Sequence, residues 1–386
     1  MHHLTARRRV LLGALASAVF PAFGQRDDRQ LSDAVDNAIR PLMAQFDIPG
    51  MAVGLTLAGR RHVFPFGVAS RESGAPVTPE TLFEIGSLSK TFTATLAALA
   101  QVRGKLSLQD SPGRFVPALR GSAIDAASLL HLGTYTAGGL PLQFPDGIDD
   151  EAQALAFFRA WKPAAPPGAQ RNYSNPSIGL LGHITGLAMG RDFSELVETQ
   201  VLAGLGMRQT FLRVPASRLD TYAWGYNKAK QPIRVNPGVF DMQAYGIKSS
   251  VTDMLAFLEA NIDPSPLEPA LRQAVEATHA GHFRVGPMVQ GLGWEQYPLP
   301  VPLSRLQAGN AADMLLQPQP AHALAGTPAG RGPALFNKTG STNGFGAYAA
   351  FVPRQRAGVV LLANRNIPIP ARIDAADAVL RSVVSV

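Results

Sequence analysis

Phe83-Glu84-Ile85-Gly86-Ser87-Leu88-Ser89-Lys90-Thr91 is the stretch that decides the fold, because it begins a helix with a serine three residues before a lysine. Apolar residues then recur at helical spacing, which predicts a helix from about Ser87 to Val102 that ends at Gly104. Residues three apart on a helix share a face. We therefore expect the Ser87 hydroxyl and the Lys90 amine to touch.

Ser87 and Lys90 are the residue types that form an activated nucleophile. A serine hydroxyl is a weak nucleophile until a neighbouring neutral amine accepts its proton. The helix N-terminus adds unpaired N–H groups and partial positive charge near an attacked carbonyl. Gly86 permits a tight turn into the helix. The alternative interpretation is structural, with Ser87 serving as a helix cap.

Two further motifs follow along the chain, Tyr173-Ser174-Asn175 and Lys338-Thr339-Gly340. Lysine is scarce here, with seven residues against 28 arginines. Lys90 alone has a serine three residues before it, and Lys338 alone precedes Thr-Gly. The scarcity makes coincidental occurrence of both motifs rare, so the three motifs favour one acyl-transfer site.

Tyr173 is the candidate general base of this site. A phenol has a pKa of about 10, which two nearby ammonium groups would lower. The phenolate would then accept protons from Ser87 and later from water. We expect Asn175 to hydrogen-bond Lys90 and an amide of the substrate. The alternative is a loop tyrosine whose hydroxyl satisfies the backbone.

The last motif is predicted to lie on a strand beside the serine. Lys338 would supply positive charge to Tyr173 and to an anionic substrate, and Thr339 would donate a hydrogen bond to a carboxylate. Gly340 would let a substrate lie against the strand, and the N–H groups of Ser341 and Ser87 would form an oxyanion hole. The alternative is a polar edge strand. Lys248-Ser249-Ser250 has a similar composition but lacks the glycine.

Composition excludes several classes of protein. The 386 residues are 46% hydrophobic and 16% charged, which is typical of an ordered globular chain with room for two structural units. The formal charge of +7 includes no basic run with interleaved aromatics, so we expect no nucleic-acid partner. There is no cysteine, which excludes a thiol nucleophile. The eight histidines form no helical ligand pair, so neither a metal nor a cofactor is expected.

Residues 1–24 are predicted to be a secretory signal peptide. Arg7, Arg8 and Arg9 form its charged segment, and Val10 to Phe20 form an apolar segment too short to span a bilayer. The arginines also resemble a twin-arginine signal. We therefore expect a periplasmic protein without a stable membrane association.

Strand patterns lie near both ends of the mature chain, and helical patterns lie between them. Residues 25–104 and 241–386 are predicted to form an α/β domain whose mixed, largely antiparallel sheet is flanked by helices, and residues 105–240 to form an inserted all-α domain. Helices are expected at 30–47, 125–133, 149–161, 176–189 and 192–205, and from Pro370 onward. Strands are expected at 51–57, 62–66, 335–336, 347–352 and 358–363. Residues 317–334 are predicted to be an irregular loop.

The three motifs closely resemble those of class C (AmpC-type) serine β-lactamases. Further segments resemble the same family in order: Thr134 to Gln143, Ala244 to Lys248, Gln290 to Glu295 and Leu362 to Asn366. The resemblance implies a β-lactamase/transpeptidase-like fold, no metal, and hydrolysis of cephalosporins and penicillins through an acyl-enzyme on Ser87. The small-molecule β-lactam would be the partner, and nothing in the sequence suggests an oligomer, so a monomer is expected.

The resemblance also implies roles for the remaining residues. Lys90, Tyr173 and Lys338 would manage protons and charge. The substrate-binding residues would be Gln143, Asn175, Tyr245, Thr339, Gly340 and Asn366. Three positions depart from the family pattern, namely Asn337, Asn343 and Ile367, and Ile367 is expected to alter the wall beside the carboxylate site.

Two rival functions remain open at this level. Penicillin-binding DD-peptidases and esterases share the serine, lysine and tyrosine, although they often lack the lysine that Lys338 retains. A non-enzymatic binding or structural protein on the same scaffold would be expected to lose a motif residue, and none is lost.

Overall fold

A nine-stranded sheet forms the centre of the computed structural model, which describes residues 28–324 and 332–386. The predicted signal peptide lies outside these residues. In spatial order the strands are β13 (His322–Ala323), β9 (Gly281–Val285), β10 (Met288–Gly291), β11 (Glu295–Pro298), β14 (Ala334–Ser341), β15 (Gly346–Val352), β16 (Ala357–Ala363), β1 (Gly50–Leu57) and β2 (Arg60–Gly67). Every pairing in this sheet is antiparallel.

The central strands are apolar throughout because the sheet is covered on both faces. Side chains alternate along a strand, and in β16 Val359 and Leu361 enter one core whereas Val360 and Leu362 enter the other. The prediction of one largely antiparallel sheet built from both ends of the chain is confirmed. The prediction that the sheet is mixed is wrong, because its described strands include no parallel pair.

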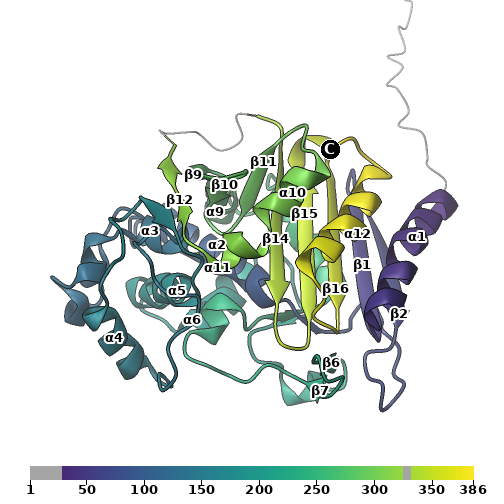
Figure 1. Cartoon of the computed structure of the whole chain (residues 1–386), viewed down its shortest axis with the longest axis horizontal. Helices are drawn as coiled ribbons and strands as arrows, with labels where there is room; N and C mark the ends of the chain where they lie inside the picture. The colour runs from purple at the N-terminus through teal and green to yellow at the C-terminus, as the bar shows by residue number, and fades with distance from the viewer. Residues whose placement is uncertain (1–27, 325–331) are drawn as a thin grey trace, which may run out of the picture.

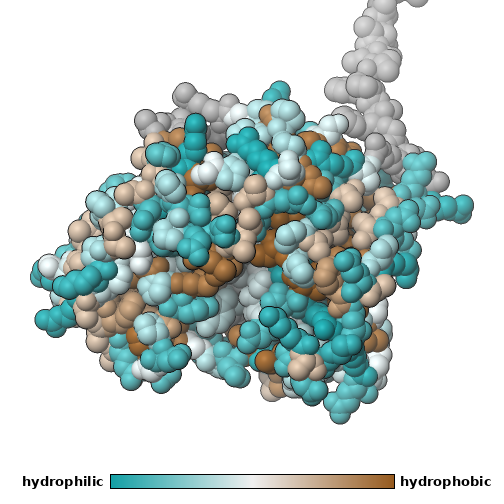
Figure 2. All heavy atoms as spheres, viewed as in Figure 1, coloured by the Kyte–Doolittle hydropathy of each residue, from teal (hydrophilic) through white to brown (hydrophobic). Residues whose placement is uncertain are grey.

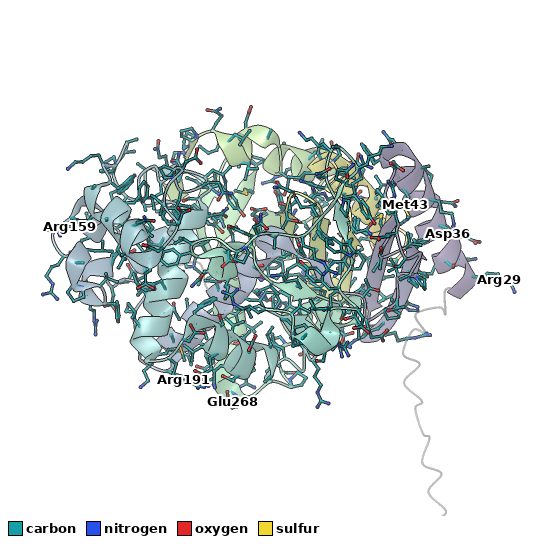
Figure 3. The ribbon with its side chains drawn as sticks, turned by 90° about the horizontal axis from the view of Figure 1, so that it is seen from below. Arg29, Asp36, Met43, Arg159, Arg191 and Glu268 are labelled. Atoms are coloured by element: carbon teal, nitrogen blue, oxygen red, sulfur yellow. The ribbon has the colours of Figure 1, made fainter. Side chains whose placement is uncertain are left out.

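Helices α1 (Asp28–Phe46) and α12 (Ile369–Arg381) cover one face of the sheet (Figure 1). Val35 and Ile39 of α1 and Ile373 and Val379 of α12 are fully buried in the core on this side. The opposite face of α1 is polar, and Arg29 and Asp36 point outward in Figure 3. Both helices were predicted from their apolar periodicity.

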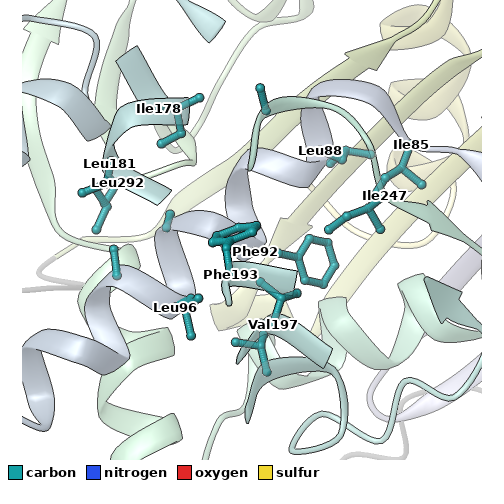
Figure 4. Packing of buried hydrophobic residues seen from close by; sticks show 14 of the residues in the cluster. Ile85, Leu88, Phe92, Leu96, Ile178, Leu181, Phe193, Val197, Ile247 and Leu292 are labelled. Atoms are coloured by element: carbon teal, nitrogen blue, oxygen red, sulfur yellow. The ribbon is translucent and has the colours of Figure 1, made fainter. Parts of the chain in front are cut away.

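Helices α2 (Ser89–Val102), α8 (Val251–Ile262) and α9 (Pro269–Thr278) lie on the other face. Twelve of the 14 residues of α2 are buried, so this helix runs through the middle of the core (Figure 4). Phe92 stacks on Phe257 of α8 with 4.2 Å between ring centroids. The helix that carries the site is therefore held rigidly from all sides.

Helices provide most of the regular secondary structure between residues 105 and 240. This segment contains α3 (Leu129–Gly133), α4 (Glu151–Ala160), α5 (Asn175–Met189), α6 (Phe193–Leu196) and a π-helical turn, η5 (Val197–Leu202), together with 3₁₀ turns at Pro112–Arg114, Pro117–Leu119, Ala123–Ala126 and Ala216–Arg218. The helix predicted at 125–133 is α-helical only in its second half, because Ser128 caps a separate α3. The helix predicted at 192–205 changes from α to π geometry at Val197.

The remaining strands and α-helices of the described chain are short. They are β3 (Phe83–Glu84), β8 (Lys248–Ser249) and β5 (Thr210–Phe211) in one sheet, β4 (Gln170–Arg171) with β12 (Gln319–Pro320), β6 (Gly225–Tyr226) with β7 (Pro232–Ile233), and α7 (Asp241–Ala244), α10 (Leu303–Gly309) and α11 (Ala312–Leu316). The loop predicted at 317–334 is wrong where β12 and β13 form, because β4 and β9 supply distant pairing partners.

The division into an α/β part (25–104 and 241–386) and a helical part (105–240) remains a prediction. Across residues 28–324 and 332–386, no helix combines the length and apolar character that crossing a membrane requires.

Candidate active site

Two glycines bring the serine-bearing turn against strand β14. Ser87 lies in a 3₁₀ turn, η1 (Gly86–Leu88), between β3 and α2. Gly86 has φ +52°, and a Cβ there would come within 2.4 Å of the Ser341 nitrogen. A Cβ on Gly340 would come within 1.9 Å of the Ile85 carbonyl oxygen. The side-chain position of Gly340 thus faces the turn that carries Ser87, so the lack of a side chain here lets the turn and the strand meet.

The expected contact between Ser87 and Lys90 is present. Lys90 Nζ donates to Ser87 Oγ at 2.9 Å and to the Ala244 carbonyl oxygen at 2.7 Å. Ser87 does not cap the helix, which was the alternative interpretation. The residue before α2 is Leu88, which makes no side-chain cap, and the Ser87 hydroxyl accepts a hydrogen bond from Lys90. Burial lowers the pKa of Lys90 to about 8, with the Lys338 charge acting in the same direction and Tyr173 opposing it. Lys90 is therefore much closer to a neutral base than an exposed lysine is.

Tyr173 lies between the two lysines. It follows β4 and precedes α5, whose N-terminus is capped by Ser174. Lys90 Nζ is 5.1 Å and Lys338 Nζ is 5.0 Å from its ring centroid. Burial alone would raise the pKa of Tyr173, but the Lys338 and Lys90 charges lower it to about 8. Its hydroxyl is buried near Ser87, Lys90 and Lys338. It has no hydrogen-bond partner with standard geometry among the described residues.

Lys338 is fully buried on β14 and keeps its charge. Burial lowers its pKa, but Glu295 and Tyr173 raise it, and the net result is above the usual value. Lys338 Nζ lies 3.4 Å from Glu295 Oε1 and donates to the Thr339 carbonyl oxygen at 3.3 Å. This lysine is therefore a permanent positive charge beside Tyr173.

Sequence reasoning missed two buried charged residues of the site, Arg171 and Glu295. Arg171 Nη2 lies 3.5 Å from Glu295 Oε1, and the Arg171 guanidinium is 5.2 Å from the Tyr173 ring centroid. Two signals were available: Arg171 stands two residues before Tyr173, and Glu295 ends a segment that resembles the family. Neither signal revealed that Glu295 contacts both Arg171 and Lys338.

A cavity of about 450 Å³ opens over these residues. It is lined by most of the predicted site residues, namely Ser87, Gln143, Tyr173, Asn175, Tyr245, Lys338, Thr339, Gly340, Ser341 and Asn366. Lys90 lies beneath the lining. Figure 2 shows hydrophobic residues in the hollowed centre of this face and mainly hydrophilic residues around its outer margin. The fold thus gathers the predicted set around one cavity.

The amide side chains at one end of the cavity contact each other. Asn175 Nδ2 donates to Gln143 Oε1 at 2.9 Å, and the buried Asn175 Oδ1 has no partner among the described residues. The expected hydrogen bond between Asn175 and Lys90 is absent, because Lys90 donates to Ser87 and Ala244 and the Asn175 amide nitrogen donates to Gln143. Tyr245 lines the same cavity, and burial raises its pKa.

Arg372 organises the opposite end and was also missed. From α12 it donates to Ser341 Oγ at 3.0 Å, to Asn366 Oδ1 at 2.6 Å and to the Gly340 carbonyl oxygen at 2.6 Å. Burial lowers the pKa of Arg372 to about 10. Because Asn366 Oδ1 already accepts this bond, its amide nitrogen is the group left to face a ligand.

The expected effect of Ile367 on the wall of this cavity is wrong. Its side chain is 3% exposed and packs in the core on the α12 side of the sheet. Ile369, two residues later, lines the cavity instead.

One wall of the cavity comes from the segment 233–236. Glu84, three residues before Ser87, accepts hydrogen bonds from the Val235 N–H at 2.7 Å and from the Tyr222 hydroxyl at 2.5 Å. The Arg234 guanidinium lies over the rings of Tyr222 and Trp224, at 3.9 and 4.3 Å from their centroids. Glu84 therefore ties this wall to the strand that leads into the nucleophile.

The comparisons with known proteins agree with this geometry. The family model described as Beta-lactamase matches residues 35–383. The chain belongs to the beta-lactamase family. A Beta-lactamase from Pseudomonas fluorescens is 48% identical over 92% of this chain and 99% of its own. A crystal structure of a class C beta-lactamase in complex with cefoxitin matches with TM-score 0.89 at 44% identity, over 92% and 99% of the two chains.

A beta-lactamase/D-alanine carboxypeptidase from Pseudomonas syringae matches equally well, with TM-score 0.89, 43% identity and coverage of 91% and 98%. Together these relatives confirm the class C, AmpC-type resemblance and the β-lactamase/transpeptidase-like fold. The chain is a class C serine β-lactamase. In the described part of this β-lactamase, no three His, Asp or Glu side chains gather as a metal-binding group.

The close approach at Gly340 gives a testable prediction. In Gly340→Ala the new methyl group must displace the turn that carries Ser87, since Ile85 O stands 1.9 Å from its position. Misplacement of about 1 Å can reduce a rate by about 10²-fold. We expect kcat/KM for a cephalosporin to fall by about that factor. Gly59→Ala is the control, because a Cβ there meets nothing within 4 Å, although its φ of +84° predicts a small loss of stability.

Proposed function

We propose that this β-lactamase hydrolyses the lactam amide of cephalosporins and penicillins through an acyl-enzyme on Ser87. The observation that carries the proposal is the hydrogen bond of 2.9 Å between Lys90 Nζ and Ser87 Oγ. It lies beside a phenol whose pKa is lowered to about 8, at the floor of a cavity large enough for a bicyclic substrate.

In acylation, Ser87 Oγ attacks the lactam carbonyl carbon while its proton passes to Lys90 or Tyr173. The C–N bond then breaks, and the ring nitrogen takes a proton from the same pair, which leaves an ester on Ser87. The pKa values of Lys90 and Tyr173 are both about 8 and the two groups interact, so they titrate as a pair and the proton is shared between them. In deacylation the pair accepts a proton from water, whose oxygen attacks the ester carbon. The bond between that carbon and Ser87 Oγ then breaks, and Ser87 Oγ takes the proton back from the pair.

The developing negative charge would be stabilised by backbone N–H groups of Ser87 and Ser341. Gly86 and Gly340 support this arrangement, because they let the turn and the strand approach within contact distance. The substrate carboxylate would meet Lys338, Thr339, and the Nδ2 of Asn366. Gln143 and Asn175 would hold the side-chain amide at the other end.

A steady-state assay with a chromogenic cephalosporin tests the proposal. We expect many turnovers per enzyme molecule, unaffected by a chelator such as EDTA, because the proposed reaction uses only side chains and water. A single burst of product equal to the enzyme concentration, with no further turnover, would contradict hydrolysis and indicate a protein that is only acylated.

A second candidate function is the removal of D-alanine from peptides. The reason is that two matching structures are described as D-alanine carboxypeptidases, from Pseudomonas syringae and Burkholderia cenocepacia. Both reactions begin with attack on an amide carbonyl next to a carboxylate-bearing group. Release of D-alanine from a D-alanyl-D-alanine peptide, measured beside cephalosporin turnover, decides between them. A larger kcat/KM for the peptide would replace the proposal.

We further propose that the protein is exported to the periplasm and acts there as a monomer without stable membrane association. The support is the sequence pattern of residues 1–24, together with the lack of a membrane-spanning helix among the described residues. Fractionation of cells that express the full chain, followed by size-exclusion chromatography, tests both statements.

A further inference from the structure

Three buried cations surround the ring of Tyr173. Lys90 Nζ, Lys338 Nζ and Arg171 Cζ lie 5.1, 5.0 and 5.2 Å from its centroid. Within residues 28–324 and 332–386, Glu295 is the one carboxylate that forms ion pairs with this group, at 3.4 Å from Lys338 and 3.5 Å from Arg171. Both Arg171 and Glu295 line the cavity wall, although the proposed proton transfers use neither.

We propose that the Arg171–Glu295 pair is a positioning element that fixes Lys338 beside Tyr173 and sets the pH range in which Ser87 is acylated. The inference rests on the proposed function. It assigns to the pair an influence on Tyr173 and Lys90, with no direct part in bond making.

The first support is the rigid attachment of Arg171. Its Nε donates to Gln290 Oε1 at 2.7 Å and its Nη1 to the Met314 carbonyl oxygen at 2.6 Å. These bonds join β4, β10 and α11. Arg171 is 2% exposed and Glu295 4% exposed, so neither charge can turn toward solvent. A fixed, buried charge pair acts on its neighbours with less screening than an exposed pair does.

The second support is the contact between neighbouring strands. Glu295 begins β11 opposite Asn337 of β14, one residue from Lys338, and its Oε1 reaches Lys338 Nζ at 3.4 Å from the end of the strand. Lys338 is held from the other side by its own contact with the Thr339 carbonyl oxygen. Loss of Glu295 would therefore remove the one carboxylate that holds this ammonium group beside Tyr173.

The third support is the balance of charge. Glu295 raises the pKa of Tyr173, Lys90 and Lys338, because its negative charge favours their protonated forms. The other charged or titratable groups that face it from the surrounding elements are Arg171, Tyr135, Tyr297 and Tyr348. Burial raises the pKa of all three tyrosines, so they stay neutral in the working range. The charges of Glu295 and the three cations thus set the pH at which the deprotonated forms of Tyr173 and Lys90 appear.

The test compares pH profiles of kcat/KM for a chromogenic cephalosporin from about pH 5 to about pH 10. The wild-type profile should rise with an apparent pKa of about 8, the value of Tyr173 and Lys90. Glu295→Gln removes the negative charge, so the rise should move about one pH unit lower. Arg171→Gln removes a cation, so the rise should move about one pH unit higher.

The double variant Glu295→Gln/Arg171→Gln removes one charge of each sign and should bring the rise back to the wild-type position. Arg171→Lys keeps the charge and should also leave it in place. Glu259→Gln is the matched control, since Glu259 of α8 is a partly buried carboxylate that pairs with Arg61 of β2. It should leave the profile unchanged.

A second readout follows Tyr173 directly, by carbon-13 NMR of protein with labelled tyrosine, with the signal assigned by its loss in Tyr173→Phe. The pKa read from the Tyr173 signal should fall in Glu295→Gln and rise in Arg171→Gln. Falling rates with unmoved profiles and an unmoved titration would show that the pair is merely structural and would overturn the inference. If one single variant does not fold, the direction of the other still decides. An absence of wild-type turnover would contradict the proposed function instead, and the NMR titration would then test the inference alone.

Discussion

Ser87→Ala is expected to reduce kcat for cephalosporin hydrolysis by at least about 10⁴-fold. The hydroxyl is the atom to which the acyl group is attached, and no other described hydroxyl receives a hydrogen bond from Lys90. The variant removes one oxygen from a turn that is held by backbone contacts, so the fold should be unchanged. Steady-state turnover together with thermal unfolding measures both effects.

Ser89→Ala is the matched control for this prediction. Ser89 lies in the same motif and is fully buried, but its hydroxyl accepts a hydrogen bond from the Ile247 N–H at 3.1 Å. Leaving that N–H unpaired costs about 1–3 kcal/mol of stability. Ser89→Ala should therefore unfold at a lower temperature and keep most of its activity. Equal loss of activity in both variants would contradict the assignment of the nucleophile.

Lys90→Met is expected to reduce kcat/KM by about 10²–10⁴-fold, the usual contribution of a general base. The side chain keeps its length but loses the nitrogen that contacts Ser87 Oγ. Lys248→Met is the control. Lys248 is also largely buried, yet its amine contacts only the Gly246 and Leu212 carbonyl oxygens within the described chain, and its sequence motif lacks the glycine.

The stability of Lys90→Met separates chemistry from unfolding. The pKa of Lys90 falls from 10.5 in the unfolded chain to about 8 in the fold. Below pH 8 the amine is protonated in both states, and its burial costs stability on the order of 3 kcal/mol. That cost fades as the pH rises from 8 toward 10.5, because the folded state then releases the proton first. At pH 7 the variant should unfold at the same or a higher temperature, although the Ala244 carbonyl loses a donor.

The contact between Ser87 and Lys90 was predictable because it is local. Both residues lie within one turn of a helix, where spacing alone fixes proximity. The strands of β1, β2, β15 and β16 were predictable for a similar reason, since each is an apolar run with its own turn signals. Lys338-Thr339-Gly340 could be recognised as a motif because lysine is scarce in this chain. Its position next to Ser87 depends on the two glycines at 86 and 340.

The charged residues of the site were not predictable in the same way. Glu295 reaches Lys338 from the first residue of the neighbouring strand β11, and Arg171 reaches Glu295 from a two-residue strand. Arg372 arrives from the last helix of the chain. Nothing in the spacing of these residues indicates that they meet, because each contact depends on a pairing between distant segments.

The short strands β9, β10 and β11 were missed because their pattern is interrupted. Gly286 has a positive φ between β9 and β10, and the register shifts between Gln290 and Gly291. Strands of four or five residues with such breaks lack the alternation that sequence reasoning uses. The helices α8 and α9, by contrast, have clear caps at Ser250 and Glu268 that sequence reasoning could have used.

Peptide mapping by mass spectrometry, after the wild-type protein is quenched in acid during reaction with a slowly hydrolysed cephalosporin, tests the central claim most directly. The account predicts one acyl adduct per molecule on the peptide that contains Ser87, which appears before product and disappears as substrate is exhausted. An adduct on any other residue, or rapid turnover with no covalent adduct at any time, would contradict it.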